Sequence, residues 1–170
     1  MIDRTEAPPY YFNYIDLVPA GDICALLESQ HREVDALLRG ISDERSRFRY
    51  APDKWSIREV VGHVNDAERL FTFRAFWFAR GFESELPGFD QTIAALHAAS
   101  DVRPWLSHVK EFHAVRSSTL DLFRHLPPEA WQRSGRASGY GFTVRALAHI
   151  IAGHTIHHVT ILKERYGSLG

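Results

Sequence analysis

The chain of 170 residues has a single cysteine, Cys24, and can therefore form no intramolecular disulfide bond. Because proteins of oxidising compartments usually carry paired cysteines, we expect a soluble, cytoplasmic protein. Cys24 lies in an apolar stretch, which favours a buried and inert thiol over a nucleophile. The first 14 residues are polar and aromatic, so we expect no signal peptide.

Long apolar runs and an excess of one sign of charge are also absent. No apolar run approaches the roughly 20 residues that cross a bilayer, so no membrane partner is expected. The 20 Lys and Arg residues nearly balance the 21 Asp and Glu residues, and this balance does not predict nucleic-acid binding. A mild basic cluster at Arg45, Arg47 and Arg49 is typical of a solvated loop.

Three catalytic motifs are missing as well. No Gly-x-Ser-x-Gly occurs, which argues against a serine hydrolase elbow. Thr155 follows His154 where the zinc-peptidase motif has its glutamate, so peptidase chemistry of that type is not expected. A di-iron carboxylate bundle needs two Glu-x-x-His motifs, and the segment 28–31 is the only one.

What the sequence does contain is four long segments with the apolar spacing of amphipathic helices, and few strand signals. The first is predicted from about Pro19, in its first turn, to Leu38. The third covers roughly 90–125, with an interruption near Pro104. The segment 133–141, rich in Gly and Ser, is predicted to be a flexible loop.

The second and fourth segments have clear start signals. Ser56 is the expected N-cap of the second helix, and Glu59 completes a capping box. The second half of this helix, before Gly81, is apolar nearly all round, so we expect deep burial there. The aromatic residues of that half are accordingly assigned to the core: Phe73, Phe76 and Trp77. The fourth helix should begin after Thr143 and run to about Tyr166.

Length and composition suit a single domain over residues 1–170, because 45% of the residues are apolar, enough for a core. With four long helices and few strands, we expect an all-α protein built as a four-helix bundle.

Ten histidines are the one compositional oddity. His154 and His158 are four residues apart, so they lie on one helix face, which also carries apolar residues such as Ile151. Two imidazoles one turn apart can chelate a metal ion. Chance alone gives roughly 0.6 such pairs in a chain with ten histidines, so the spacing by itself is weak evidence.

His63 strengthens the metal interpretation, because it lies among apolar residues two turns into the second helix. Each buried imidazole needs a polar partner, and one shared metal ion would satisfy all three. We therefore hypothesise one divalent metal ion held by His63, His154 and His158. Imidazole ligands suit Zn, Ni, Cu or Fe, and affinity order alone does not decide among them; of these we favour Zn or Ni.

Two segments resemble a known family. Residues 55–68, WSIREVVGHVNDAE, are similar to the second-helix signature of the DinB/YfiT superfamily, and 149–158, HIIAGHTIHH, to its last-helix signature. The resemblance implies an up-down-down-up bundle, often a homodimer. It also implies a metal site at His63, His154 and His158, with water or substrate in the remaining positions.

The resemblance leaves three functions open. Many members are regarded as metal-dependent hydrolases, and others are transferases or isomerases that use low-molecular-weight thiols such as bacillithiol or mycothiol. We favour a hydrolase with an open three-histidine site acting on an unknown small-molecule substrate. The alternatives are a thiol-dependent S-transferase or isomerase, and a non-enzymatic metal-binding stress-response module. A pocket beside an open metal position would indicate an enzyme.

Two further histidines could join the site. His157 is a rival ligand, because a spacing of three residues from His154 also permits chelation, but the resemblance favours His158. His149 lies on a different helix face and is expected to be structural or exposed.

Three charged residues are candidates for supporting roles. Asp66 and Glu59 each lie one turn from His63 and could accept a hydrogen bond from its free ring nitrogen. Glu59 has a competing role in the capping box, so we favour Asp66. Arg74 lies three turns beyond His63 on nearly the same face and could meet an anionic substrate group, although most helical arginines extend to solvent.

Overall fold

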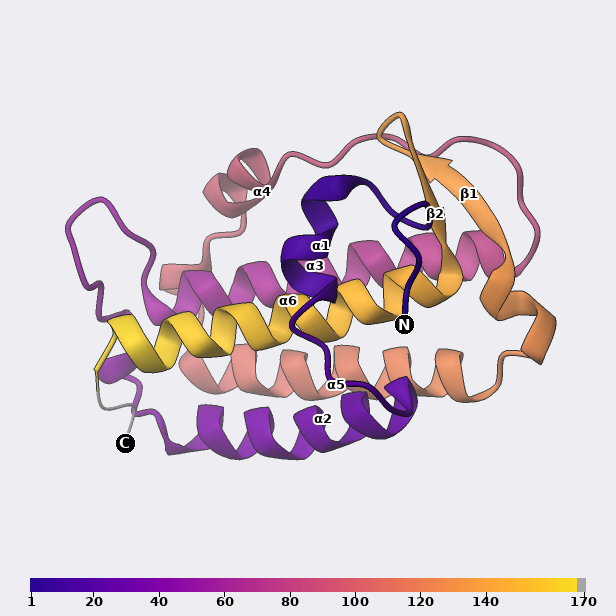
Figure 1. Cartoon of the computed structure of the whole chain (residues 1–170). Coiled ribbons are helices and arrows are strands. Elements are labelled where there is room, and N and C mark those ends of the chain that lie inside the picture. The colour runs from indigo at the N-terminus through magenta and orange to yellow at the C-terminus, as the bar shows by residue number, and fades with distance from the viewer. Residues whose placement is uncertain (168–170) are drawn as a thin grey trace.

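The computed structural model describes residues 1–167 and is dominated by four long helices. These are α2 (Ile23–Gly40), α3 (Ile57–Ala79), α5 (Trp105–Arg124) and α6 (Val144–Arg165). In Figure 1, α2 and α6 run in one direction along the bundle, and α3 and α5 run in the other. This is the up-down-down-up course that was expected, so the four-helix-bundle prediction is confirmed.

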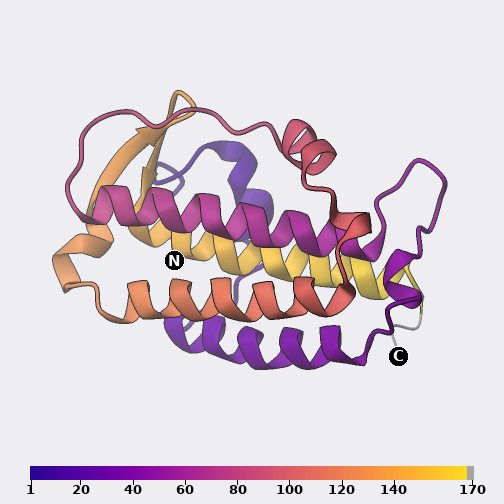
Figure 2. The ribbon, with the colours of Figure 1, turned by 180° about the vertical axis from the view of Figure 1, so that it is seen from behind.

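The successive long helices α3 and α5 are parallel, so the chain between them must return along the whole length of the bundle. This connection carries α4 (Gln91–His97) and lies over one side of the bundle in Figures 1 and 2. The interruption predicted near Pro104 is confirmed, because α5 begins at the next residue. The remaining short elements are η1 (Pro9–Tyr11), α1 (Phe12–Ile15), η2 (Arg45–Arg47), η3 (Ser100–Val102) and η4 (Pro128–Gln132).

The helix starts show how well local signals predict boundaries. Ser56 and Glu59 form the predicted capping box of α3, and the Thr143 hydroxyl caps α6. The predicted start of the first long helix at Pro19 is wrong. Asp22 is the N-cap, because its carboxylate accepts hydrogen bonds from the backbone N–H groups of Cys24 and Ala25.

The segment 133–141, predicted to be a flexible loop, is mostly an antiparallel hairpin, which corrects that prediction. Strands β1 (Ser134–Ala137) and β2 (Tyr140–Thr143) pair around a two-residue turn. Both turn residues, Ser138 and Gly139, have positive φ, as tight hairpin turns require. A Cβ on Gly135 would lie 2.1 Å from the Phe78 ring, so this glycine allows the hairpin to pack on α3.

The expected burial of the second half of α3 is also wrong in part. Phe73 is 48% exposed and Phe76 is 37% exposed, whereas Phe78 is buried. Trp77 is half-buried and stacks on Phe82, with ring centroids 4.1 Å apart. The physical reason is that the elements packed on α3, chiefly α5, α6 and β1, leave one side of its second half uncovered. Its aromatic residues on the opposite side face outward.

Charged groups are found both inside and outside this bundle. Arg116, fully buried on α5, donates to both carboxylate oxygens of Glu68 at 2.7 and 2.8 Å.

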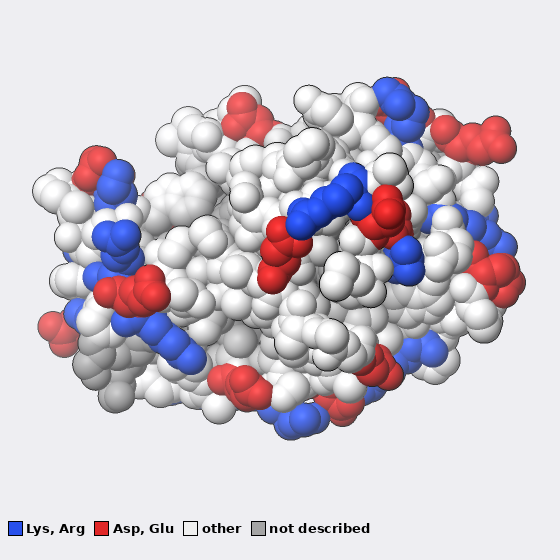
Figure 3. Space-filling view, in the orientation of Figure 1, with Lys and Arg blue, Asp and Glu red and all other residues white. Residues whose placement is uncertain are grey.

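On the face shown in Figure 3, basic and acidic residues are interspersed, without a large area of one sign. Within residues 1–167, no helix is both long enough and apolar enough to cross a membrane.

Candidate metal centre

Three histidines from two helices converge in the middle of the bundle. His63 lies on α3, and His154 and His158 lie one turn apart on α6. The Nε2 atom of His154 lies 3.1 Å from Nε2 of His63 and 3.1 Å from Nε2 of His158. One ring nitrogen from each residue lies within 4.8 Å of the others. The three predicted ligands are therefore brought together.

Hydrogen bonding alone cannot satisfy this cluster. The His154 Nε2 atom has either one hydrogen or one lone pair, so it makes a good hydrogen bond to one neighbour and leaves the other contact unfavourable. Two nitrogen ligands at 2.0–2.1 Å from a tetrahedral metal would lie about 3.4 Å apart, close to the observed spacing. Three neutral imidazoles at this spacing therefore fit a divalent cation.

The surroundings keep these imidazoles in the form that binds a metal. Burial, together with the nearby His157, lowers the pKa of His63 to about 4. Burial and the neighbouring histidines lower the pKa of His158 to about 3, and that of His154 well below its ordinary value. All three are therefore neutral near pH 7, with lone pairs available for coordination.

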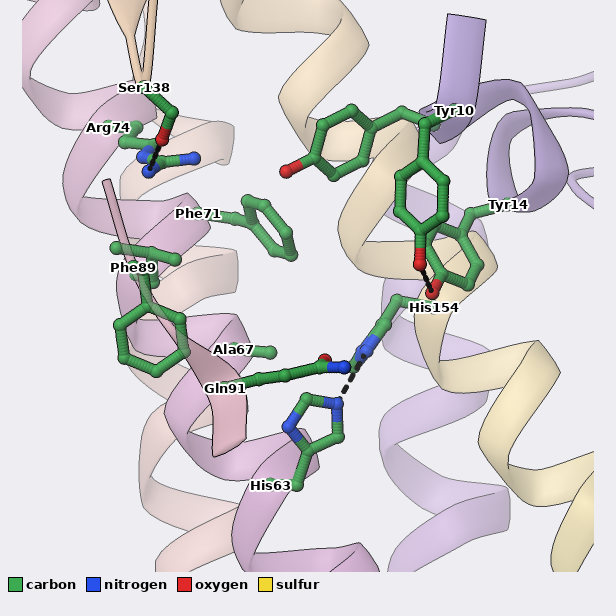
Figure 4. Close-up of a pocket in the computed structure, with 12 residues that line it drawn as sticks. Tyr10, Tyr14, His63, Ala67, Phe71, Arg74, Phe89, Gln91, Ser138 and His154 are labelled. Carbon is green, nitrogen blue, oxygen red and sulfur yellow. Dashed lines mark hydrogen bonds between the residues drawn. The ribbon is translucent and has the colours of Figure 1, made fainter. Parts of the chain in front are cut away.

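The histidine cluster opens into a cavity of about 210 Å³ between α3, α6, the N-terminal segment and the hairpin. Figure 4 shows His63 and His154 at one end and Arg74 with Ser138 at the other. The remaining lining residues are aromatic, apolar and amide side chains: Tyr10, Tyr11, Tyr14, Ala67, Leu70, Phe71, Phe89 and Gln91. The cavity therefore has polar groups at both ends and mainly aromatic and apolar walls between them.

The N-terminal segment brings tyrosines to the cluster. The Tyr14 ring lies 5.2 Å from the His154 ring, edge to face, and its hydroxyl lies 3.2 Å from that of Tyr10. Burial raises the pKa of the Tyr14 phenol, which is therefore a neutral hydrogen-bonding group at pH 7. This close approach depends on Gly153, because a Cβ there would lie 2.1 Å from the Tyr14 carbonyl oxygen.

The two additional histidines lie outside the cluster. His157 packs its ring on Tyr14 at 5.3 Å and is not among the three converging residues. His149 is half-buried, and its Nδ1 lies 2.8 Å from the Arg145 carbonyl oxygen, as suits a structural role. Cys24 is half-buried and not fully buried as predicted, but this burial still raises the pKa of its thiol, in keeping with an inert group.

Of the three charged candidates, only Arg74 lines the cavity beside the histidines. Asp66 accepts a hydrogen bond from Arg69, and Glu59 binds the Ser56 N–H group and Arg49. Within residues 1–167, neither carboxylate is hydrogen-bonded to His63, so the supporting role suggested for Asp66 has no contact behind it. Arg74, in contrast, is buried and lines the same cavity as His63.

Several cavity residues were not identified from the sequence. Tyr10, Tyr11 and Tyr14 carry a signal, since aromatic residues three and four apart near a helical turn indicate one packed face. Phe89, Gln91 and Ser138 carry none, because only the course of the α3–α5 connection and the hairpin brings them to the site.

The fold of this chain is found in several solved structures. YfiT from Bacillus subtilis, described as a probable metal-dependent hydrolase with an unusual four-helix bundle topology, aligns with a TM-score of 0.72 and 15% identity. The alignment covers 96% of this chain and 90% of YfiT. A DinB-like protein, YjoA from Bacillus subtilis, aligns with a TM-score of 0.60 and 21% identity over 84% of this chain and 87% of that chain.

A mycothiol-dependent maleylpyruvate isomerase also aligns, with a TM-score of 0.66 and 13% identity over 85% of this chain. This chain spans 61% of the isomerase, which is the longer protein. No curated protein sequence matches the chain.

The family resemblance seen in two helices extends over most of the sequence. The profile of the DinB superfamily matches residues 26–162, which include all three converging histidines. Because this match covers well over half of the 170 residues, the chain belongs to the DinB superfamily.

Proposed function

We propose that this protein is a metal-dependent hydrolase whose divalent ion, Zn or Ni, is held by His63, His154 and His158. The observation that carries the proposal is the convergence of three neutral imidazoles, two of which, His63 and His154, line one end of a cavity. The description of YfiT as a metal-dependent hydrolase supports it. Among residues 1–167, no fourth protein ligand joins the cluster, as expected for an open site.

The chemistry follows from this arrangement. A divalent ion bound by three imidazoles supplies a Lewis acid that lowers the pKa of a water or thiol and polarises a carbonyl group. The chain itself contributes a partly enclosed cavity, in which the neutral Tyr14 phenol can donate a hydrogen bond to a substrate oxygen. Phe71 and Leu70 supply apolar walls that exclude water from the substrate.

A hydrolase panel with metal-reconstituted protein tests this proposal. Nitrophenyl esters, anilides and lactones would be assayed with wild type, with His63→Ala and with His125→Ala. His125 is the matched control, because its side chain is 75% exposed and it is not among the converging histidines. We expect turnover in wild type and in His125→Ala, and loss to background in His63→Ala. Equal rates in all three proteins would overturn the proposal.

A thiol-dependent S-transferase or isomerase is the second candidate. The fold shared with a mycothiol-dependent isomerase favours it, and a low-molecular-weight thiol would then be a partner. Adding bacillithiol or mycothiol to the same assays separates the two candidates. A reaction that occurs only with the thiol present, and that either attaches the thiol to the product or regenerates it after isomerisation, would replace the hydrolase proposal with this one.

The setting of the activity is proposed on separate grounds. We infer a single domain over residues 1–170 that forms a homodimer, as the family resemblance implies, and works in the cytoplasm, because one cysteine allows no internal disulfide bond. Light scattering coupled to size exclusion measures the mass directly. A mass of one chain, 19.4 kDa, would contradict the homodimer.

A further inference from the structure

Arg74 is an unusual buried charge. It is one of three arginines that are nearly completely buried, with 1% of its surface exposed. The other two have carboxylate partners: Arg58 lies 2.6 Å from Asp43, and Arg116 lies 2.7 Å from Glu68. Within residues 1–167, no carboxylate forms an ion pair with Arg74.

The groups around Arg74 are all neutral. Its Nη2 donates to the Ser138 hydroxyl at 3.0 Å and to the Pro87 carbonyl oxygen at 3.3 Å. The Tyr11 phenol also lies beside it, and burial, which outweighs the effect of the guanidinium, raises the pKa of that phenol. Tyr11 is therefore uncharged at pH 7. A buried cation with only neutral partners is costly in a folded protein.

The hydrogen bonds from Arg74 to Ser138 and Pro87 both start from Nη2, which leaves Nε without a partner within residues 1–167. The Nε–H of Arg74 is buried and unsatisfied among the described residues. Buried donors of this kind are rare, and each indicates strain, an absent ligand or a functional role. The guanidinium and the histidine cluster line the same cavity, so an absent anion would lie in the substrate space.

Arg74 and His63 lie on the same face of α3, at the two ends of the cavity. Arg74 follows His63 by eleven residues, which is about three turns, so both lie on one face with Cα atoms about 16 Å apart. Long helical side chains lean toward the helix N-terminus, which brings the guanidinium nearer to His63. The cavity of about 210 Å³ has the space of about seven waters, which suits a small molecule.

We propose that Arg74 binds a carboxylate of the substrate, whose reacting group then lies at the three histidines. This deepens the proposed function and rests on it, because it assigns the substrate to small carboxylate-bearing esters, amides or thiol adducts. A carboxylate fits better than a phosphate dianion, since Arg74 is the only Lys or Arg among the residues that line the cavity. The guanidinium presents paired donors that match a carboxylate.

Ser138 completes this site from the hairpin turn. Its hydroxyl accepts from Arg74, so its own hydrogen remains free to be donated to the same carboxylate. Ser138 has a φ of 55°, in the left-handed region that non-glycine residues rarely occupy. The tight hairpin turn requires this φ, and the turn holds the Ser138 hydroxyl beside Arg74.

Calorimetry with simple probes tests the proposal without any turnover. Butyrate, its neutral analogue butyramide, and inorganic phosphate would each be titrated into zinc-reconstituted wild type, Arg74→Gln, Ser138→Ala and the control Arg80→Gln. Arg80 is an exposed residue at the end of the same helix. We expect butyrate to bind wild type and Arg80→Gln equally, and at least about tenfold more weakly to Arg74→Gln. A smaller loss is expected for Ser138→Ala, and metal content should not change.

Three results would overturn the proposal. If Arg74→Gln binds butyrate as tightly as wild type, the carboxylate binds the metal alone. If butyramide binds as tightly as butyrate, the negative charge of the ligand is not recognised. If phosphate binds more tightly than butyrate, the ligand class is not carboxylates. Should Arg74→Gln not fold, the Nε–H proton signal of Arg74 in wild type decides. It should move downfield with butyrate, and no movement would contradict the assignment. Carboxylate binding that needs Arg74, without turnover in the hydrolase panel, would reject the proposed reaction and keep this binding site.

Discussion

The Nε2 atoms of His63 and His154 lie 3.1 Å apart, although 91 residues separate them in the chain. Neither helix can place these nitrogens alone; the contact exists because α3 and α6 pack along most of their length. The apolar residues on both helices therefore position the proposed metal ligands. A change that moves one helix relative to the other should weaken metal binding without touching a histidine.

Gly153, the residue before His154, allows a separate test of how α1 packs on α6. A Cβ on this residue would lie 2.1 Å from the Tyr14 carbonyl oxygen, so Gly153→Ala must push α1 away from α6. We expect a loss of about 1–3 kcal/mol in the free energy of unfolding, because backbone cannot yield as a side chain can. Chemical denaturation measures it.

The control for this substitution is Gly40→Ala. Gly40 is also a helical glycine, but it has no atom within 4 Å of the added Cβ. Alanine should be neutral or slightly stabilising there, since it favours helix more than glycine does. Equal stability of the two variants would show that α1 does not press on α6.

The exposed aromatic residues of α3 lead to a second stability prediction. Phe78→Ala should cost about 3–5 kcal/mol, because this side chain is 1% exposed and packs in the core. Phe73→Ala should cost less than about 1 kcal/mol, because nearly half of Phe73 is exposed. Thermal unfolding of both variants checks this, and a comparable loss for Phe73→Ala would contradict the outward orientation.

Glu6 gives a prediction about pH. Burial alone would raise the pKa of Glu6, but hydrogen bonds from Arg145, the Asp3 N–H group and Thr143 lower it below its ordinary value of 4.5. A carboxyl group with a lowered pKa in the folded state stabilises the protein above pH 4.5. That contribution is lost as the pH falls through the folded-state pKa. Glu6 also fixes the segment that carries the cavity tyrosines.

We therefore expect Glu6→Gln to be about 1–3 kcal/mol less stable than wild type at pH 7. The difference should shrink as the pH is lowered below about 4.5, where Glu6 of the wild type takes up a proton. Urea denaturation at several pH values measures this difference. Glu83→Gln, a change at an exposed carboxylate, should show no such trend. A difference for Glu6→Gln that stays constant with pH would contradict the account.

Local and pairwise signals in the sequence predicted much of this structure. The capping box at Ser56, the cap at Thr143 and the helical spacing of His154 and His158 depend only on residues within one turn, so the sequence was sufficient for them. The apolar surroundings of His63 already connected it to the other two histidines, and the family resemblance supported that connection and added the topology.

The features that were missed depend on contacts between distant segments. Phe73 and Phe78 are equally apolar, and only the placement of α5, α6 and the hairpin decides which of them is buried. The hairpin at 134–143 has little apolar alternation, and it is fixed by Gly135 fitting against Phe78. Arg74 was a candidate from its position on the helix, and only the contacts of residues 1–167 show that it is buried with neutral partners.

The most direct test of the central claim is the metal content of the purified protein, measured by plasma mass spectrometry after reconstitution with Zn or Ni. The account predicts about one ion per chain in wild type and in His125→Ala, and loss of the ion in His63→Ala, His154→Ala and His158→Ala. Circular dichroism should show that the variants stay folded. A wild type that takes up no metal, or variants that retain it, would show that these histidines are not a metal site.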